Sequence, residues 1–234
     1  MNRSILASSV AACICLSLSA PLLAAAPTVT AKAVPPSSGP APANANSNEK
    51  LRAAAEPFEK LTEISFKATS PAIDQTIGEA ESAARGVRTL LSIDAASHLD
   101  AQIAAVKSAH QKQDHVGLAL ASIEAYRVLV SAVADNAKVP TEVSLLDYAG
   151  FRYDADLKAS PVRWDDMTEA VSFARENWAK LFPRAKSFPE AIAFEKAIAD
   201  MDKAVARKNE SSAALSVKAE LDLVDQLESF FSAH

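Results

Sequence analysis

Cysteine is almost missing from this chain of 234 residues, and its absence excludes several kinds of site. The two cysteines are Cys13 and Cys15, and both lie in an apolar segment near the N-terminus. Without that segment the chain can form no disulfide, no thiolate metal site and no C-x-x-C-H haem attachment. The fold must therefore be held together by its own hydrophobic core.

Glycine is also scarce, and no run of alternating β-branched residues occurs. Only Gly78, Gly86, Gly117 and Gly150 follow Gly39, whereas alanine is abundant throughout. This composition is typical of helices. We therefore expect an all-α protein, built as one or more antiparallel up-and-down helical bundles.

A surplus of positive charge is lacking as well. Lys and Arg number 24 against 29 Asp and Glu, which gives a net charge of -5. Such a chain is poorly suited to nucleic acid or to anionic lipid. The sequence also lacks a G-x-S-x-G motif, a glycine-rich phosphate loop and histidines at zinc-binding spacing. We expect no enzymatic activity, no resident cofactor and no nucleic-acid partner.

The N-terminus has the features of a secretory signal peptide. Arg3 precedes an apolar run over residues 5–23, and three alanines up to Ala26 offer a cleavage site. Residues 1–26 are therefore predicted to direct the chain to the periplasm or out of the cell. A membrane-anchored form is the alternative, since the run is long enough to cross a bilayer if it stays uncleaved. Residues 10–13 also resemble a lipobox, which would place a lipid on Cys13.

Residues 27–48 form a second segment of unusual composition. They contain five prolines, no aromatic residue and one charge, Lys32. A stretch of this kind buries too little apolar surface to offset the entropy of ordering it. We predict a disordered tether between the signal peptide and the folded part.

The rest of the chain carries an internal repeat. Residues 70–91 match residues 160–181 at an offset of 90, with eight identities in 22 positions. We interpret residues 49–138 and 139–234 as two copies of a four-helix unit of about 90 residues. The predicted helices cover 49–68, 72–92, 96–112, 115–135, 141–158, 162–182, 189–208 and 210–232. Two bundles are favoured, with one larger bundle or a short solenoid as the alternatives.

Helix boundaries and buried faces follow from local chemistry. Asp114 and Asn209 are predicted N-caps, and Pro71 and Pro161 are predicted to separate helices and to open the next one. Apolar residues recur at helical spacing, which predicts one buried face per helix. Four such stripes are Ile73-Ile77-Ala80-Ala84-Val87-Leu91, Trp164-Met167-Val171-Ala174-Trp178-Leu181, Phe194-Ile198-Met201-Val205 and Val217-Leu221-Val224-Phe231.

His110 is the candidate metal ligand. It continues the stripe of Leu99, Ile103 and Val106, whereas the other copy has Val205 at the matching position. A histidine in place of an aliphatic residue can ligate a metal or haem. The alternative is a histidine at the core boundary that is bonded to a neighbouring side chain.

Four further residues are candidates for ligand binding. Tyr148 and Arg152 stand one helical turn apart and could both donate to a carboxylate-bearing ligand. They could equally belong to a solvated ladder of side chains, with Gly150 permitting close helix packing. Trp164 and Trp178 lie on one stripe and could form an aromatic wall or ordinary core.

These observations favour a non-catalytic function. We expect an exported helical-bundle protein that binds an envelope protein or a small ligand through helix faces or a groove between the copies. The alternative is a periplasmic bundle that handles metal or haem at His110. The residues do not indicate the identity of the ligand or the oligomeric state.

Overall fold

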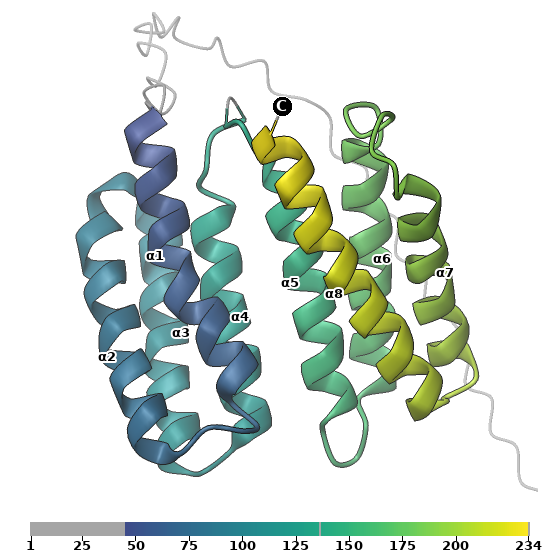
Figure 1. Ribbon diagram of the computed structural model, residues 1–234. Coiled ribbons are helices and arrows are strands. Elements are labelled where there is room, and N and C mark those ends of the chain that lie inside the picture. The colour runs from purple at the N-terminus through teal and green to yellow at the C-terminus, as the bar shows by residue number, and fades with distance from the viewer. Residues whose placement is uncertain (1–44, 136, 234) are drawn as a thin grey trace, which may run out of the picture. The chain divides into compact units, whose positions relative to one another are not determined.

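The structure is a computed structural model that describes residues 45–135 and 137–233, and within these ranges it contains helices and no strand (Figure 1). The α-helices are α1 (Ala45–Ile64), α2 (Ser70–Val87), α3 (Ile93–Gln111), α4 (His115–Val130), α5 (Thr141–Leu157), α6 (Trp164–Leu181), α7 (Ala191–Ala206) and α8 (Glu210–Ala233), with a 3-10 turn at Arg88–Leu90. The predicted all-α fold is confirmed. The predicted signal peptide, Cys13 and residues 27–44 of the predicted tether lie outside the described residues.

None of the helices within residues 45–135 and 137–233 combines the length and the apolar character that a span of a bilayer requires.

The predicted caps are present. The Asp114 carboxylate accepts a hydrogen bond from the Gly117 N–H at 2.8 Å, and the Asn209 side chain accepts one from the Ser212 N–H at 2.8 Å. Both bonds satisfy a donor of the first helical turn that has no partner within the helix. The α3–α4 and α7–α8 connections therefore end in the same kind of cap.

The starts of α1, α2, α3, α6 and α7 differ from the prediction by two to four residues. Helix α1 begins at Ala45 because the Asn48 side chain accepts a hydrogen bond from the Ala134 N–H at 3.0 Å, which fixes this turn against the chain after α4. Pro71 does lie in the first turn of α2, as predicted. Pro161 does not open a helix, because α6 starts only at Trp164.

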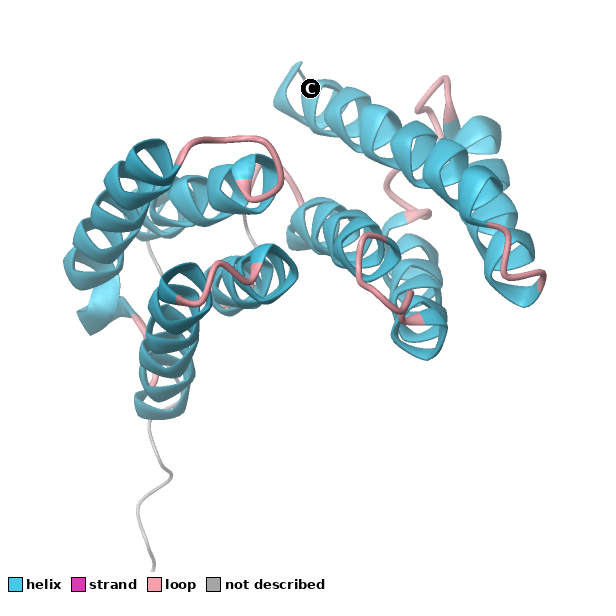
Figure 2. Cartoon of the chain, turned by 90° about the horizontal axis from the view of Figure 1, so that it is seen from below, coloured by secondary structure: helices cyan, strands magenta, loops and turns pink. Residues whose placement is uncertain are grey.

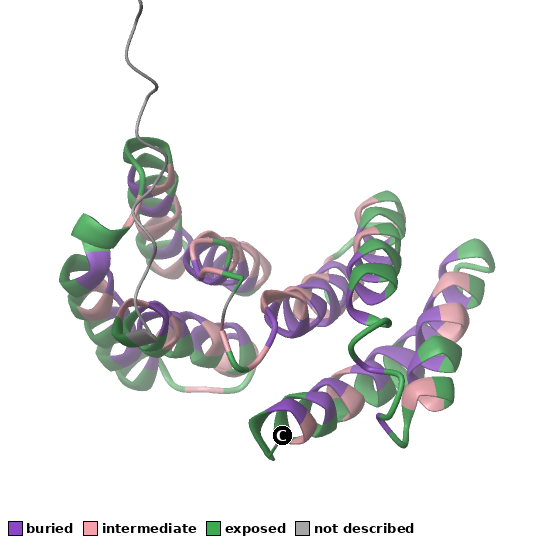
Figure 3. Cartoon of the chain, turned by 90° about the horizontal axis from the view of Figure 1, so that it is seen from above, coloured by how far each residue is buried: buried purple, intermediate pink, exposed green. Residues whose placement is uncertain are grey.

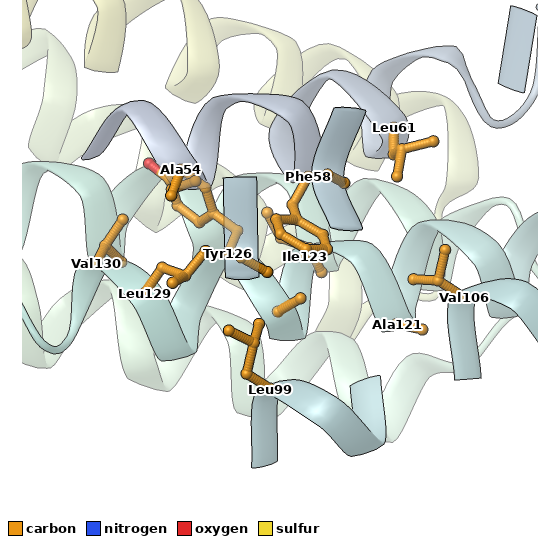
Figure 4. Close-up of a cluster of buried hydrophobic side chains, with 14 of the residues drawn as sticks. Ala54, Phe58, Leu61, Leu99, Val106, Ala121, Ile123, Tyr126, Leu129 and Val130 are labelled. Atoms are coloured by element: carbon orange, nitrogen blue, oxygen red, sulfur yellow. The ribbon is translucent and has the colours of Figure 1, made fainter. Parts of the chain in front are cut away.

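The buried side chains form two clusters, one for each half of the described chain. Helices α1–α4, the N-terminal half, enclose the first cluster, and α5–α8, the C-terminal half, enclose the second. Figure 4 shows the first cluster, to which α1 contributes Phe58, α3 contributes Leu99 and α4 contributes Ile123. The purple faces in Figure 3 turn inward in both halves, as expected for helices with one apolar side.

Each half has the same pattern of neighbours. Helix α1 packs on α2 and α4, and α3 packs on α4; in the C-terminal half α5 packs on α6 and α8, and α7 packs on α8. Consecutive helices run in alternating directions (Figure 1), and the two groups are seen end-on in Figure 2. The halves meet mainly through α5, which packs on α4 and, over a shorter length, on α1.

Candidate functional site

A small cavity lies at the junction of the two halves, and we call it the acidic cleft. Its volume is about 80 Å³. Helix α1 lines one side and α8 the other, with α4 and α5 between them. Its polar lining residues are Arg52, Glu56, Glu59, Tyr126, Ser144, Asp147, Asp225 and Glu228. Five of these side chains are carboxylic acids, and they come from three helices.

The deepest carboxyl groups are shut off from solvent. Asp147 is 9% exposed, and Glu220 of α8 is 0% exposed. The charge of Asp147 is close enough to Glu220 to raise the pKa of that carboxyl. Neither carboxyl oxygen of Glu220 has a hydrogen-bond partner among the described residues. Buried polar groups in proteins are nearly always hydrogen-bonded, so this position calls for a specific explanation.

Gly150 makes room for the Glu220 carboxyl. A Cβ atom at position 150 would lie 2.2 Å from Glu220 Oε2 and 2.6 Å from Leu221 Cδ2. These distances are too short for any side chain larger than hydrogen. The glycine therefore serves close packing of α5 against α8, the role considered for it from the sequence.

The carboxyl groups around the cleft have no basic partners. Within residues 45–135 and 137–233, seven acidic residues in or near the cleft form no ion pair, namely Glu56, Glu59, Glu63, Asp147, Glu220, Asp225 and Glu228. Arg52 is the single basic residue in the lining. Its guanidinium donates to the Val139 carbonyl at 2.6 Å and to Ser144 Oγ at 3.1 Å. The cleft consequently holds a surplus of acidic groups.

Burial and mutual repulsion raise the pKa values of the cleft carboxyls. Burial raises the pKa of Glu59 to about 7, with further contributions from Glu63 and Glu228. Burial also raises the pKa of Asp147 well above its usual range; the charge of Glu59 adds to this, and a hydrogen bond from Tyr126 opposes it. The pKa of Glu220 is raised by burial and then by Asp147. The charged forms of these carboxyls are therefore disfavoured in the folded state.

Sequence reasoning missed this cleft, although one signal was present. Glu220 stands between Val217 and Val224 on the apolar face of α8, where the other buried residues apart from Ser216 are aliphatic or aromatic. Asp147 likewise shares a face of α5 with Val143 and Gly150. An acidic residue within a buried stripe was the feature that could have identified the site.

The structure brings Tyr148 and Arg152 together on the other side of the α4–α5 contact. The Tyr148 hydroxyl donates to Glu124 Oε1 at 2.5 Å, and Arg152 Nη1 donates to the Tyr148 oxygen at 3.1 Å. Glu124 and the cleft residue Tyr126 are two positions apart on α4, so they point in roughly opposite directions.

Arg152 is already surrounded by acidic groups of this chain. Its guanidinium nitrogens lie 3.2 Å from Glu169, 3.8 Å from Asp166 and 3.9 Å from both Glu124 and Asp156. The buried Asp156 also pairs with Arg163 at 3.0 Å, and burial raises its pKa to about 6. A ligand carboxylate at Arg152 would have to displace these partners.

The two tryptophans do not form a common wall. Trp178 stacks on Phe194 with ring centroids 4.6 Å apart, and its Nε1 donates to Glu195 at 3.4 Å. Trp164 is half-buried at the start of the same helix. Fourteen residues separate them, which is about 21 Å along a helix. Each tryptophan has its own surroundings.

His110 is bonded to a side chain of a neighbouring helix. Its Nε2 lies 2.8 Å from Asp74 Oδ1 and 3.4 Å from Ser70 Oγ, at the edge of an open hollow of about 540 Å³. His115 lines the same hollow, and its Nδ1 lies 2.7 Å from the Ser65 carbonyl. In the described part of the chain, no group of three or more His, Cys, Asp or Glu residues is placed to hold a metal ion.

Comparison with known proteins finds no relative of this chain. No protein-family model matches the chain, and neither a curated protein nor a solved structure matches it.

Proposed function

We propose that this chain is a non-catalytic binding protein of the cell envelope and that a small positively charged ligand binds in the acidic cleft. One observation carries the proposal. Five carboxyl groups from α1, α5 and α8 line the cleft, and no basic side chain of the described residues forms an ion pair with any of them. A positively charged ligand would supply the missing partner.

The energetic argument supports a role other than stability. A buried polar group without a partner destabilises a fold by about 1–3 kcal/mol, and packed apolar side chains in its place often stabilise the protein. Several acidic residues in one cleft thus make the fold less stable than an apolar junction would. Clusters of groups with displaced pKa values are frequent at functional sites.

The size and chemistry of the cleft narrow the class of ligand. A volume of about 80 Å³ is far below the 300–1,000 Å³ of pockets for drug-sized ligands. The polar lining offers carboxyl and hydroxyl oxygens and no histidine or cysteine. Carboxylate and hydroxyl oxygens suit an ammonium group, whereas no three acidic side chains of the described residues are placed to hold a metal ion.

Calorimetric titration at pH 8 tests the proposal with Ca²⁺, Mg²⁺, Mn²⁺ and putrescine as probes. We expect saturable binding of at least one probe, and at least a tenfold loss of affinity in the Glu59→Gln/Asp147→Asn variant. The matched control is Asp202→Asn/Asp222→Asn, which removes two carboxylates from exposed ion pairs on α7 and α8. Absence of binding by every probe, or equal loss in both variants, would refute the proposal.

The same titration separates the alternative at His110. A metal site centred on this histidine requires its imidazole, so His110→Val would abolish binding while Glu59→Gln/Asp147→Asn would leave it intact. Our proposal predicts the reverse. The observation that favours the cleft is that Asp74 already occupies His110 Nε2.

Export is part of the proposal and rests on the sequence of residues 1–26. Fractionation of the native host should recover the chain in the periplasm or the medium. Recovery from the cytoplasm would contradict this, and recovery in the membrane would favour the anchored or lipidated alternative.

We also infer that the two halves descend from one duplicated four-helix unit. The turn before α4 and the turn before α8 support this. Gln113 and Lys208 both have positive φ, at 56° and 48°, and each precedes the N-cap residue. In addition, the Asp114 N–H donates to the Ala109 carbonyl at 2.9 Å, and the Asn209 N–H donates to the Ala204 carbonyl at 3.0 Å. A crystal structure in which the two halves differ in helix order or in these turns would contradict a common origin.

A further inference from the structure

We infer that the acidic cleft is the moving part of a hinge. The two halves would pivot about the α4–α5 contact, so that the cleft widens when its carboxylates are charged and unoccupied and narrows when protons or a bound cation neutralise them. The cation part of this inference rests on the proposed function, whereas the proton part does not.

The walls of the cleft belong to different halves and carry charge of the same sign. Helix α1 of the N-terminal half presents Glu56 and Glu59, and α8 of the C-terminal half presents Asp225 and Glu228. Electrostatic repulsion across the cleft acts on Glu59 from both Asp225 and Glu228. When charged, these groups push α1 and α8 apart.

Every helix that lines the cleft contributes at least one titratable group. The titratable groups that line it are Arg52, Glu56 and Glu59 from α1, Tyr126 from α4, Asp147 from α5, and Asp225 and Glu228 from α8. Outside the lining, Glu63 of α1 acts on Glu59, and Asp147 acts on the buried Glu220 of α8. Arg52 is the one cation among them. Its guanidinium donates to Ser144 and to the Val139 carbonyl and forms no ion pair with a cleft carboxylate, although its charge attracts Glu228 of α8 and partly offsets the repulsion.

The opposite side of the α4–α5 contact is built as a fixed joint. The Tyr148 side chain of α5 is buried within the core of the N-terminal half and donates to Glu124 of α4. The Arg127 guanidinium lies over the Tyr148 ring, 5.4 Å from its centroid, and Phe173 meets the same ring edge-on at 5.2 Å. These contacts hold α4 and α5 together without involving the walls of the cleft.

Hydrogen bonds also fasten one end of the cleft. The Asn48 side chain of α1 exchanges hydrogen bonds with Ala134, and Lys138 Nζ donates to the Ser232 carbonyl of α8 at 2.6 Å. Both bonds tie a helix to the connection between α4 and α5. Widening should therefore be greatest at the other end, where α1 finishes and α8 begins.

Distance measurements between spin labels test the hinge in the full chain. The native cysteines are first removed by Cys13→Ser and Cys15→Ser. The labels are then placed at Lys67→Cys, just after α1, and Ala214→Cys, near the start of α8; both positions are exposed. We expect the mean distance to be longer at pH 8.5 than at pH 5. A pair within the N-terminal half, Lys67→Cys and Ala105→Cys, should give one distance at both pH values.

A variant without the titrating groups identifies their role. In Glu59→Gln/Asp147→Asn/Glu220→Gln the distance between positions 67 and 214 should no longer change with pH. Should this variant fail to fold, Glu59→Gln alone should reduce the change. An unchanged distance in the native sequence, or an equal change in the variants, would overturn the hinge.

A cation added at pH 8.5 distinguishes the hinge from the proposed function. The probe bound most tightly in calorimetry should return the label distance to its value at pH 5. A pH-dependent distance with no binding of any probe would uphold proton control and refute the cation site. Binding without any change of distance, with either pH or cation, would uphold the site and refute the hinge.

Discussion

Glu220 occupies a place on α8 where the surrounding pattern calls for an aliphatic side chain. It is fully buried, lies beside Asp147 and has no hydrogen-bond partner among the described residues. Packing alone gives no reason for a carboxyl group there. At the scale of single residues, the case for a functional cleft depends on this position.

We expect Glu220→Met to stabilise the protein at pH 7. The replacement removes a buried carboxyl without a partner and should raise the free energy of unfolding by about 1–3 kcal/mol. Urea denaturation measures the change. Glu169→Met at an exposed position of α6 is the control and should give no gain; destabilisation by Glu220→Met would indicate that the carboxyl has a structural partner.

Gly150→Ala should be destabilising because its Cβ would collide with Glu220 and Leu221. Overpacking of this kind costs about 1–3 kcal/mol. Gly78→Ala on α2 is the matched control, since nothing lies within 4 Å of its Cβ position, and it should stabilise the helix by up to about 1 kcal/mol. Similar results for the two variants in thermal denaturation would contradict the close contact of α5 and α8.

Some helix ends could be predicted from the local sequence and others could not. Asp114 and Asn209 could be identified as caps because a side-chain acceptor before an apolar stripe has few other uses. The start of α6 could not be predicted from Pro161, since residues between Pro161 and Trp164 continue the connection before the helix forms. Helix caps can be predicted from the local sequence, whereas the length of a connection depends on the packing of the helices it joins.

The cap of α4 gives a prediction for one element. Asp114→Ala should lower the free energy of unfolding by about 1 kcal/mol, because the Gly117 N–H loses its acceptor. Asp94→Ala, in the first turn of α3, removes the same charge without a capping bond and should cost about 0.3–1 kcal/mol or less. Equal losses in urea denaturation would show that charge alone, and not the cap, stabilises α4.

The turn before α8 gives a second prediction for a single element. Lys208 has a φ of 48°, a conformation that side chains with a Cβ atom adopt at a cost. We expect Lys208→Gly to raise the free energy of unfolding by about 0.5–1 kcal/mol. Lys180→Gly in the last turn of α6 should instead be destabilising, and the same sign for both variants would argue against the positive φ.

At the scale of the whole molecule, helical composition and stripe spacing were sufficient to predict an all-α fold with helices near their observed positions. The cleft could not be predicted in the same way. Glu59, Asp147 and Glu220 lie far apart in the chain, and only the packing of α5 against α4 and α8 brings their surroundings together. The residues singled out from the sequence, Tyr148 and Arg152, proved to lie at the joint between the halves.

Folding stability should depend on pH through the cleft. Glu59 has a pKa of about 7 in the folded state against an ordinary value of 4.5, so both states hold the proton below pH 4.5. Between these values the unfolded chain loses its proton first, and stability falls as pH rises towards 7. Asp147 and Glu220 act in the same direction.

Melting temperatures across this pH range, without divalent cations, check the expectation. The fall in stability between pH 5 and pH 8 should be smaller in Glu59→Gln/Asp147→Asn than in the native sequence, and Asp202→Asn/Asp222→Asn should behave like the native sequence. A native protein that gains stability over this range would contradict the raised pKa values.

Native mass spectrometry of the protein purified from its own host tests the central claim most directly. The account predicts an added mass, that of a small amine, which is present on the native chain and lost from Glu59→Gln/Asp147→Asn but retained by His110→Val. A chain that carries no added mass, or an added mass that survives in the cleft variant, would contradict a cation site between α1 and α8.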